Sequence, residues 1–270
     1  MMRMREKRPS FLRIVGILIL LPVVAVPLAS ISGCFSFRIS EKKIQKTFAN
    51  WDMETPTYSS YSWKQGKIFY AEAGSPDQPR VILVHGSPGS WDNYLSFFGN
   101  SFLREHAHLI AVDRPGFGQS RASGPVSSLQ TQSEALSPLL DNQQASQKAI
   151  LVGHSLGGPV VAHLAVDHPD KVGSLILVAP SISPDLEELR WYNQAARFPL
   201  VQWVLPRALR YSNQEIIPLK QGLERLEPQL AELQIPVIVI QGEKDNLVPH
   251  QNADFVKKAF VQARVKIEKY

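Results

Sequence analysis

A serine in the stretch GHSLGG, residues 153–158, has the sequence surroundings of a catalytic nucleophile. The apolar run AILV precedes this stretch and the amphipathic run PVVAHLAV follows it. The pattern Gly-x-Ser-x-Gly between a buried strand and a helix is typical of a sharp turn that exposes the serine Oγ at the edge of a sheet. The helix would point its N-terminus at the same place and favour negative charge there. Ser155 is therefore predicted to attack an acyl carbon, a reaction that needs a neighbouring base and a stabilised oxyanion.

Short apolar runs recur along the chain and predict the strands that must position this serine. Most show almost no alternation, as is typical of strands covered by helices on both faces. The runs cover residues 81–86, 109–116, 149–155, 174–180, 236–245 and 263–270. Helical patterns of apolar residues lie between them, for example at residues 160–165 and 253–260. The alternation predicts an α/β fold with a mostly parallel, doubly wound sheet and right-handed crossovers.

Three segments depart from this alternation. YSSYSW and KIFYAEA, residues 58–63 and 67–73, are separated by KQG and predict an antiparallel hairpin. Pro138 falls inside the helical pattern of residues 127–144, so we expect that helix to kink or to begin late. Residues 181–232 contain no strand-like run and are aromatic, basic and interrupted by prolines. Such an insertion between two strands is expected to form a small helical lid over the site.

Three motifs in order resemble the α/β-hydrolase superfamily, over about residues 58–270. HGSPGSWDNY, from His85, is similar to the HGxPG oxyanion loop of the branch that contains proline iminopeptidases and epoxide hydrolases. DRPGFGQS, from Asp113, is similar to the DxxGxGxS turn of that branch. Dehalogenases and epoxide hydrolases of this branch carry an aspartate at the elbow, whereas this chain has Ser155. Esterase, thioesterase, peptidase, C–C hydrolase and cofactor-free haloperoxidase-like chemistry therefore remain.

The resemblance also implies which groups surround the nucleophile. The backbone N–H groups of Ser87 and Leu156 would form the oxyanion hole, and removal of one such donor has cost about 3 kcal/mol in another enzyme. Asp245, in GEKDNLVP after the strand VIVIQG, matches the family's acid position, with Asp185 as the reserve candidate. The alternative for Asp245 is a purely structural role in an Asx turn. His85 is expected to shape its loop.

The base that should serve Ser155 is missing from its usual place. The family's histidine follows the acid and the last strand, in the order Ser, Asp or Glu, His. No histidine follows His250 in this sequence, and His250 itself begins the pattern of the helix after Asp245. His154 is expected to turn away from the nucleophile. A triad without one member generally retains about 10³ to 10⁴ over the uncatalysed rate, so we expect a poor catalyst. We favour a fold cropped at its C-terminal end over a naturally degenerate protein.

Residues 1–33 have the sequence pattern of a leader that directs export. A basic start, the apolar run 14–29 and a few small residues are typical of a secretory signal peptide. Cys34, the single cysteine, ends the stretch ISGC and resembles the lipobox of bacterial lipoproteins, in which the cysteine carries the lipid. The alternative is an uncleaved membrane anchor, but the apolar run is shorter than the ~20 residues of a spanning helix and contains Pro22 and Pro27. Either way, we expect the domain to be exported and anchored to a membrane of the bacterial cell envelope.

The basic charge of the chain lies mainly in this leader. Residues 1–33 hold five basic residues and one acidic residue, which accounts for most of the net charge of +5. The rest of the chain has no basic stripe interleaved with aromatic residues, so nucleic acid is not an expected partner. Residues 34–57 are mixed and polar and are expected to form a tether to a single domain over residues 58–270.

Together these patterns predict an exported, membrane-tethered serine hydrolase that cleaves an ester, thioester or amide of a small-molecule acyl substrate. The alternative is a non-catalytic binding protein of the same fold, which would hold a ligand under residues 181–232. No metal or organic cofactor is expected, because no cluster of His, Cys and Asp has ligand spacing. The aromatic insertion suits an apolar acyl or aryl group, but the fold supports too many chemistries for a finer expectation.

Overall fold

The computed structural model describes residues 38–141 and 147–268, with side chains to residue 264. The expected signal peptide, residues 1–33, and the expected lipidation site Cys34 lie outside these residues. Within the described ranges, no helix combines the length and the apolar character needed to cross a bilayer.

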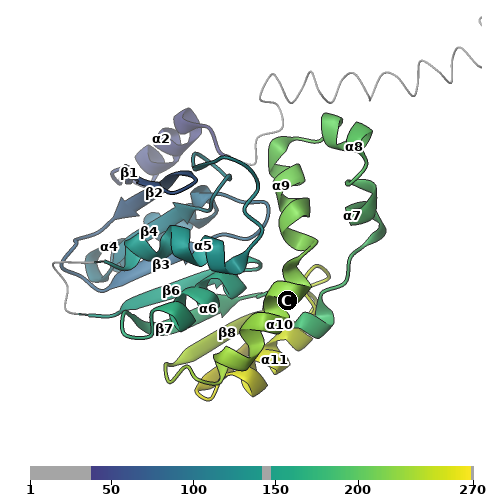
Figure 1. Cartoon of the computed structure of the whole chain (residues 1–270). Coiled ribbons are helices and arrows are strands. Elements are labelled where there is room, and N and C mark those ends of the chain that lie inside the picture. Colours follow the sequence, from purple (N-terminus) through teal and green to yellow (C-terminus); the bar gives the residue numbers. More distant parts are fainter. Residues whose placement is uncertain (1–37, 142–146, 269–270) are drawn as a thin grey trace, which may run out of the picture.

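The strands form one sheet, and its order follows the crossover rule for α/β folds (Figure 1). Its path is β1-β2-β4-β3-β6-β7-β8-β9, and a short strand β5 pairs with β2. The strands are β1 (Thr57–Trp63), β2 (Gly66–Ala73), β3 (Arg80–Val84), β4 (His108–Asp113), β5 (Arg121–Ala122), β6 (Ala149–His154), β7 (Val172–Val178), β8 (Val237–Gly242) and β9 (Ala263–Glu268).

The sheet is antiparallel from β1 to β4 and parallel from β4 onward. β1 pairs antiparallel with β2, as the sequence predicts, and β2 pairs antiparallel with β4. All pairs from β4 across to β9 are parallel. The carboxyl ends of β3, β6 and β8 therefore lie along one edge of the sheet, which is where ligands bind in open α/β sheets. The predicted fold, a mostly parallel sheet with helices, is confirmed.

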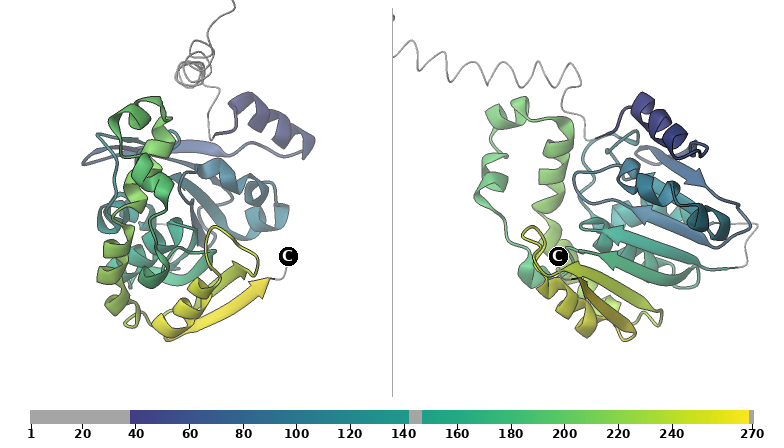
Figure 2. Two further views of the ribbon diagram at one scale, coloured as in Figure 1. Left: turned by 90° about the vertical axis from the view of Figure 1, so that its right-hand side faces the viewer. Right: turned by 180° about the vertical axis from the view of Figure 1, so that it is seen from behind.

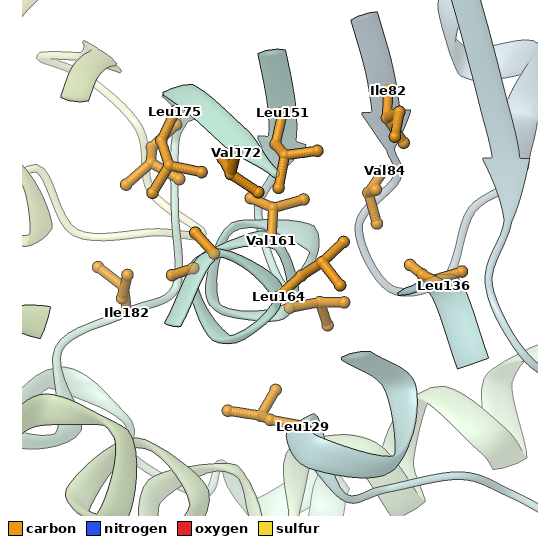
Figure 3. Packing of buried hydrophobic residues seen from close by; sticks show 14 of the residues in the cluster. Ile82, Val84, Leu129, Leu136, Leu151, Val161, Leu164, Val172, Leu175 and Ile182 are labelled. Carbon is orange, nitrogen blue, oxygen red and sulfur yellow. The ribbon is translucent and has the colours of Figure 1, made fainter. Parts of the chain in front are cut away.

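Helices cover both faces of this sheet. One face carries α5 (Leu129–Leu136), α6 (Gly157–Asp167), α10 (Leu219–Leu230) and α11 (Gln251–Ala259), whose apolar side chains share one core with the strands. Figure 3 shows Val161 and Leu164 of α6 packed between Leu151 of β6 and Leu129 of α5. The opposite face carries α2 (Glu41–Asn50), the 3₁₀ helix η1 (Trp91–Tyr94), α3 (Leu95–Phe98) and α4 (Ser101–His106).

The segment expected to be a tether contains a docked helix. Ile44 and Phe48 of α2 are fully buried against the sheet, and the rings of Phe48 and Trp51 meet edge to face. The two residues are four apart and so share one face of the helix. Residues 41–50 are therefore part of the folded domain, because this apolar stripe covers a face of the sheet that would otherwise be exposed.

Pro138 divides the helix that the sequence predicts over residues 127–144. α5 ends at Leu136, and the chain continues as a 3₁₀ helix, η2 (Ser137–Leu140), with the proline in its first turn. A proline is tolerated at this position because its missing N–H lies where no intrahelical partner is needed.

The insertion between β7 and β8 is helical. It contains the 3₁₀ helix η3 (Pro184–Leu186), α7 (Trp191–Ala195), α8 (Pro199–Val204) and α9 (Arg207–Ile216), and ends with α10. α9 lies beside the sheet, and α7 and α8 lie on the side of α9 that faces away from it (Figures 1 and 2). Prolines stand at the first position of α8 and just before α9, which explains why the segment breaks into short helices.

Candidate active site

Ser155 occupies the turn between β6 and α6 in a strained backbone conformation. Its φ is +52°, a left-handed value that residues with a side chain seldom adopt. Three backbone hydrogen bonds hold it there. Its N–H donates to Val178 O at 2.9 Å, and its carbonyl accepts from the N–H groups of Gly158 at 2.9 Å and Ser181 at 3.2 Å. Within the described residues, no group forms a hydrogen bond with Ser155 Oγ.

The glycines around Ser155 permit close backbone contacts. A Cβ on Gly153 would lie 2.5 Å from the carbonyl oxygen of Gly157, and a Cβ on Gly157 would lie 2.2 Å from that of Val84. A Cβ on Gly86 would lie 2.9 Å from Cβ of Ser155. The loop after β3 is therefore packed directly against the serine, which leaves no room for side chains at these positions.

The two expected oxyanion donors flank this contact. Ser87 follows Gly86 in the loop after β3, and Leu156 follows Ser155 as the N-cap residue of α6. Neither backbone N–H donates to an acceptor in the described part of the chain. Two amides without an acceptor next to a partly exposed nucleophile are the arrangement that can hold a developing oxyanion.

A buried ion pair supports the loop that carries Ser87. The guanidinium of Arg114 donates to Glu215 Oε1 at 2.7 Å, and both side chains are buried. The same guanidinium donates through Nε to the carbonyl of His85 at 2.9 Å and through Nη2 to that of Gly86 at 2.8 Å. Ser87 Oγ donates to Glu215 Oε2 at 2.7 Å. Helix α9 of the insertion is thus joined to the loop beside the nucleophile.

The side chains of Arg114 and Glu215 are completely buried, and this burial affects the ionisation of Glu215. Burial raises the pKa of Glu215, and the charge and hydrogen bonds of Arg114 together with those of Ser87 and Gln132 oppose that rise. Gln132 of α5 donates to Glu215 Oε1 at 3.1 Å and accepts from Arg114 at 2.7 Å. No motif in the sequence marks Glu215, Gln132 or this use of Arg114. The sequence does place Arg114 next to the aspartate of the DRPG motif. The partner of this arginine, Glu215, lies in α9, far along the chain.

His85 has the structural role expected of it. Its Nε2 accepts from the backbone N–H of Arg114 at 3.0 Å, so its Nδ1 carries the proton and donates to the carbonyl of Gly86 at 2.7 Å. Burial and the charge of Arg114 hold the pKa of His85 well below its usual value. The neutral ring therefore fixes the loop and has no free nitrogen to act as a base.

Asp245 lies after the carboxyl end of β8, in the turn before α11. Its Oδ1 accepts from the N–H groups of Leu247 at 2.9 Å and Val248 at 3.0 Å, which is an Asx-type turn. Oδ2 lies 3.5 Å from Nε2 of Gln241. The turn fixes the carboxylate and leaves Oδ2 available for a second partner, so the structural and catalytic interpretations of Asp245 are compatible.

His154, the residue before the nucleophile, lies close enough to Asp245 to be affected by its charge. Burial lowers the pKa of the His154 ring, and the negative charge of Asp245 opposes this. A Cβ on Gly86 would lie 3.3 Å from His154 Nδ1. The ring forms no hydrogen bond with Ser155 Oγ.

Among the described residues, Asp185 and His250 form no hydrogen bond with Ser155. Asp185 is exposed in η3 and lines a hollow of about 610 Å³ between α10 and α11, a volume within the usual range of small-ligand sites. Neither Ser155 nor Ser87 lines that hollow. His250 is exposed at the N-terminus of α11. Among the described residues, no three His, Cys, Asp or Glu side chains are grouped so that they could hold a metal ion.

Comparison with known proteins identifies relatives of this architecture. A family model described as alpha/beta hydrolase fold matches residues 79–215. Monoacylglycerol lipase abhd6-B of Xenopus laevis is 29% identical over 212 residues, and the match covers 76% of this chain and 58% of that protein. Lipase 1 of Psychrobacter immobilis is 26% identical over 234 residues, covering 74% of this chain and 72% of that protein. The chain thus spans little more than half the length of the Xenopus relative.

Solved structures show the same fold. The crystal structure of a membrane phospholipase A, described as a bacterial virulence factor, superposes with a TM-score of 0.65 at 22% sequence identity. The superposition covers 96% of this chain and 91% of that one. At this identity the likeness concerns the architecture, and the chemistry must be argued from the residues around Ser155.

Proposed function

Because the chain belongs to the alpha/beta hydrolase family, we propose that it is a serine hydrolase that cleaves an ester, thioester or amide by way of an acyl-enzyme. The observation that carries the proposal is the backbone of Ser155, held at a φ of +52° between a central strand and the N-terminus of α6. Such backbone strain persists where the surrounding structure imposes it. At this position it presents the Ser155 hydroxyl beside the backbone N–H groups of Ser87 and Leu156. Carboxylic esters are the favoured substrates, since relatives of the chain are lipases.

In the proposed reaction, Ser155 Oγ attacks the acyl carbon and transfers its proton to a histidine. The N–H groups of Ser87 and Leu156 donate to the oxygen that becomes negative in the tetrahedral intermediate. Collapse of this intermediate releases the alcohol, thiol or amine, which takes the proton from the imidazolium. Water then attacks the acyl-enzyme in the same manner and regenerates the serine.

Asp245 is the proposed acid, which would hold the histidine in the correct tautomer and stabilise its charged form. Its Oδ2 is the oxygen that the two turn amides leave available. We place the histidine itself beyond Tyr270, as the order of a triad in this family requires.

A fluorophosphonate probe, which reacts covalently with activated serines, tests the nucleophile. Full-length protein expressed from the complete coding sequence should be labelled, and Ser155→Ala should abolish labelling. Ser101→Ala, which alters an exposed serine at the start of α4, is the matched control and should be labelled like the unaltered protein. A folded protein that is not labelled at Ser155 would contradict the proposal and would favour the ligand-binding alternative.

The substrate class needs a separate measurement. We propose an apolar acyl group, because relatives of the chain are lipases and the insertion between β7 and β8 is rich in aromatic residues. A panel of p-nitrophenyl esters of increasing acyl length, compared with aminoacyl amides, would distinguish esterase from peptidase activity. Hydrolysis limited to aminoacyl amides would contradict the ester assignment without affecting the nucleophile.

We also propose that the protein is exported and tethered to the bacterial cell envelope by a lipid on Cys34, in the manner of bacterial lipoproteins. The basis is the sequence of the leader and the stretch ISGC. In cells fed a labelled fatty acid, Cys34→Ser should abolish incorporation and leave the leader uncleaved. Incorporation that survives this substitution would remove the lipoprotein assignment.

A further inference from the structure

Six large apolar side chains lie exposed in and directly before α7 and α8, the outer helices of the insertion. This aromatic face consists of Leu189, Trp191, Tyr192, Phe198, Leu200 and Trp203. The exposed fractions are 80% for Trp191, 83% for Leu200 and 71% for Trp203. Single exposed apolar residues are common on proteins, but a group of this size marks a surface that contacts a partner or a membrane.

The structure holds these side chains outward. Asn193 of α7 is buried and donates to Asn213 Oδ1 of α9 at 2.8 Å, and Asn213 Nδ2 donates back to the carbonyl of Asn193 at 3.1 Å. This pair fixes the polar side of α7 against α9, so Trp191 and Tyr192 remain on the outer side. α7 and α8 lie beyond α9 from the sheet (Figures 1 and 2). The aromatic face is therefore not part of the domain core.

The charges within the segment that carries this face are positive. Residues 189–214 contain four arginines and no aspartate or glutamate. Arg190, Arg197 and Arg207 are exposed. The next acidic residue along the chain, Glu215, is buried in its ion pair with Arg114. Positive charge therefore borders the aromatic face along α7 to α9, while Glu187 and Glu188 directly precede Leu189. We expect a partner that is apolar and, toward the arginines, anionic.

We propose that the aromatic face binds the surface of an anionic phospholipid bilayer. Tryptophan and leucine would enter the boundary between headgroups and acyl chains, where tryptophan is enriched in membrane proteins. The arginines would lie at the lipid phosphates, since basic residues near a membrane are attracted by its negative surface potential. This inference does not depend on the proposed hydrolysis.

The position of the face is compatible with the tether proposed above. α2 begins three residues after the first described residue, and α2 and α8 lie at the same end of the molecule in all three views (Figures 1 and 2). A lipid attached upstream of α2 and the aromatic face could therefore reach one bilayer together.

Quenching of tryptophan fluorescence by brominated lipids tests the contact. Full-length protein is reconstituted into vesicles of brominated phosphatidylglycerol, in which only tryptophans at the bilayer are quenched. The double variant Trp191→Phe/Trp203→Phe should lose most of the quenching. Trp51→Phe is the matched control, because Trp51 is 41% exposed but lies on α2, and it should retain the quenching. Equal quenching in the unaltered protein and the double variant, or none in either, would overturn the proposal.

A second experiment tests whether the contact depends on the arginines and on anionic lipid. Arg190→Glu/Arg197→Glu should lower the quenching in phosphatidylglycerol vesicles, while Lys257→Glu/Lys258→Glu, which reverses two exposed charges on α11, should not. The unaltered protein should be quenched more in brominated phosphatidylglycerol than in brominated phosphatidylcholine. Equal quenching in both lipids would overturn the anionic assignment.

A lipid-free dimer that Trp191→Ser/Trp203→Ser converts to a monomer would overturn the membrane assignment, because the face would then join two copies of the chain.

Discussion

Arg114 links residues that are far apart in the sequence but must act together in the proposed site. It contacts the carbonyls of His85 and Gly86 on one side and the carboxylate of Glu215 on the other. Fixing those carbonyls also fixes the peptide planes of the loop, and with them the direction of the Ser87 N–H. Buried ion pairs add little stability by themselves, so geometric control is the better explanation for this one.

Removing one partner of this pair should cost much more than removing both. Arg114→Met leaves the buried carboxylate of Glu215 without its cation, and loss of one member of a buried pair typically costs about 3 to 5 kcal/mol of unfolding free energy. The double variant Arg114→Met/Glu215→Leu should recover most of that loss, because no charge then remains buried. Urea unfolding of the single and double variants measures both values. A double variant no more stable than Arg114→Met would contradict this account.

The hydroxyl of Ser87 should influence the rate although it is not an oxyanion donor. Ser87→Ala keeps the backbone N–H but removes the hydrogen bond to Glu215. A typical hydrogen bond contributes about 1 kcal/mol, so a comparable loss of oxyanion stabilisation would slow fluorophosphonate labelling of Ser155 about fivefold. Ser87→Thr keeps the hydroxyl and should restore most of the rate. Identical labelling rates for Ser87→Ala and the unaltered protein would show that the contact does not position the loop.

At the scale of elements, α2 makes the clearest prediction, because the sequence favoured a tether there. Phe48 is fully buried, and truncation of a buried phenylalanine typically costs about 3 to 5 kcal/mol. Phe48→Ala should therefore destabilise the domain by about that amount. Lys46→Ala on the exposed face of the same helix should change the unfolding free energy by less than about 0.5 kcal/mol. If Phe48→Ala is equally mild in urea unfolding, α2 is not part of the cooperative unit.

The elements differ in how well the sequence predicts them, for physical reasons. β3, β4 and β6 are buried on both faces, so they appear as continuous apolar runs that need no knowledge of their neighbours. α2 has only two core residues in a polar segment, and their burial depends on the sheet beneath them. β5 has two residues, too few to form a pattern.

The same reasoning applies to the site. Ser155, Ser87 and Leu156 belong to local motifs that combine a strand, a turn and a helix, so short stretches of sequence were enough to nominate them. The pairing of Arg114 with Glu215 joins residues 101 positions apart. No local pattern encodes such a contact, because it depends on how α9 folds back over the loop.

At the scale of the whole molecule, stability should depend on pH through histidines that are neutral when folded. Burial lowers the pKa of His85 well below its usual value, and it also lowers that of His154. Because His154 is exposed, solvent screens its contribution, and we expect His85 to contribute most. In the unfolded chain these rings bind protons near pH 6.5. The unfolded state therefore binds more protons below that pH, and the free energy of unfolding should fall as the pH decreases from about 6.5.

Buried carboxyls with raised pKa values, Asp113 and Glu215, act in the opposite direction. Burial raises the pKa of Asp113 to about 6, although its oxygens accept from the N–H groups of Trp91 and Gln119. Between its unfolded pKa of about 3.9 and this value, the folded state binds the extra proton, so acidification favours folding. The histidine effect should therefore be clearest between pH 6 and 6.5 and partly offset below that range.

Replacing His85 by glutamine isolates its share of this dependence. His85→Gln removes the titrating ring but can still offer an acceptor to the backbone N–H of Arg114. The loss of unfolding free energy on acidification should be shallower in the variant, by at most about 1.4 kcal/mol per pH unit, which is the limit for one proton. Asp113 and His154 are unchanged, so their contributions cancel in the comparison. Urea unfolding of both proteins at about pH 7.5, 6.5 and 5.5 measures the slope of the unfolding free energy against pH in each. Parallel slopes would mean that the buried ring takes up its proton without unfolding, which its contacts with Gly86 and Arg114 should prevent.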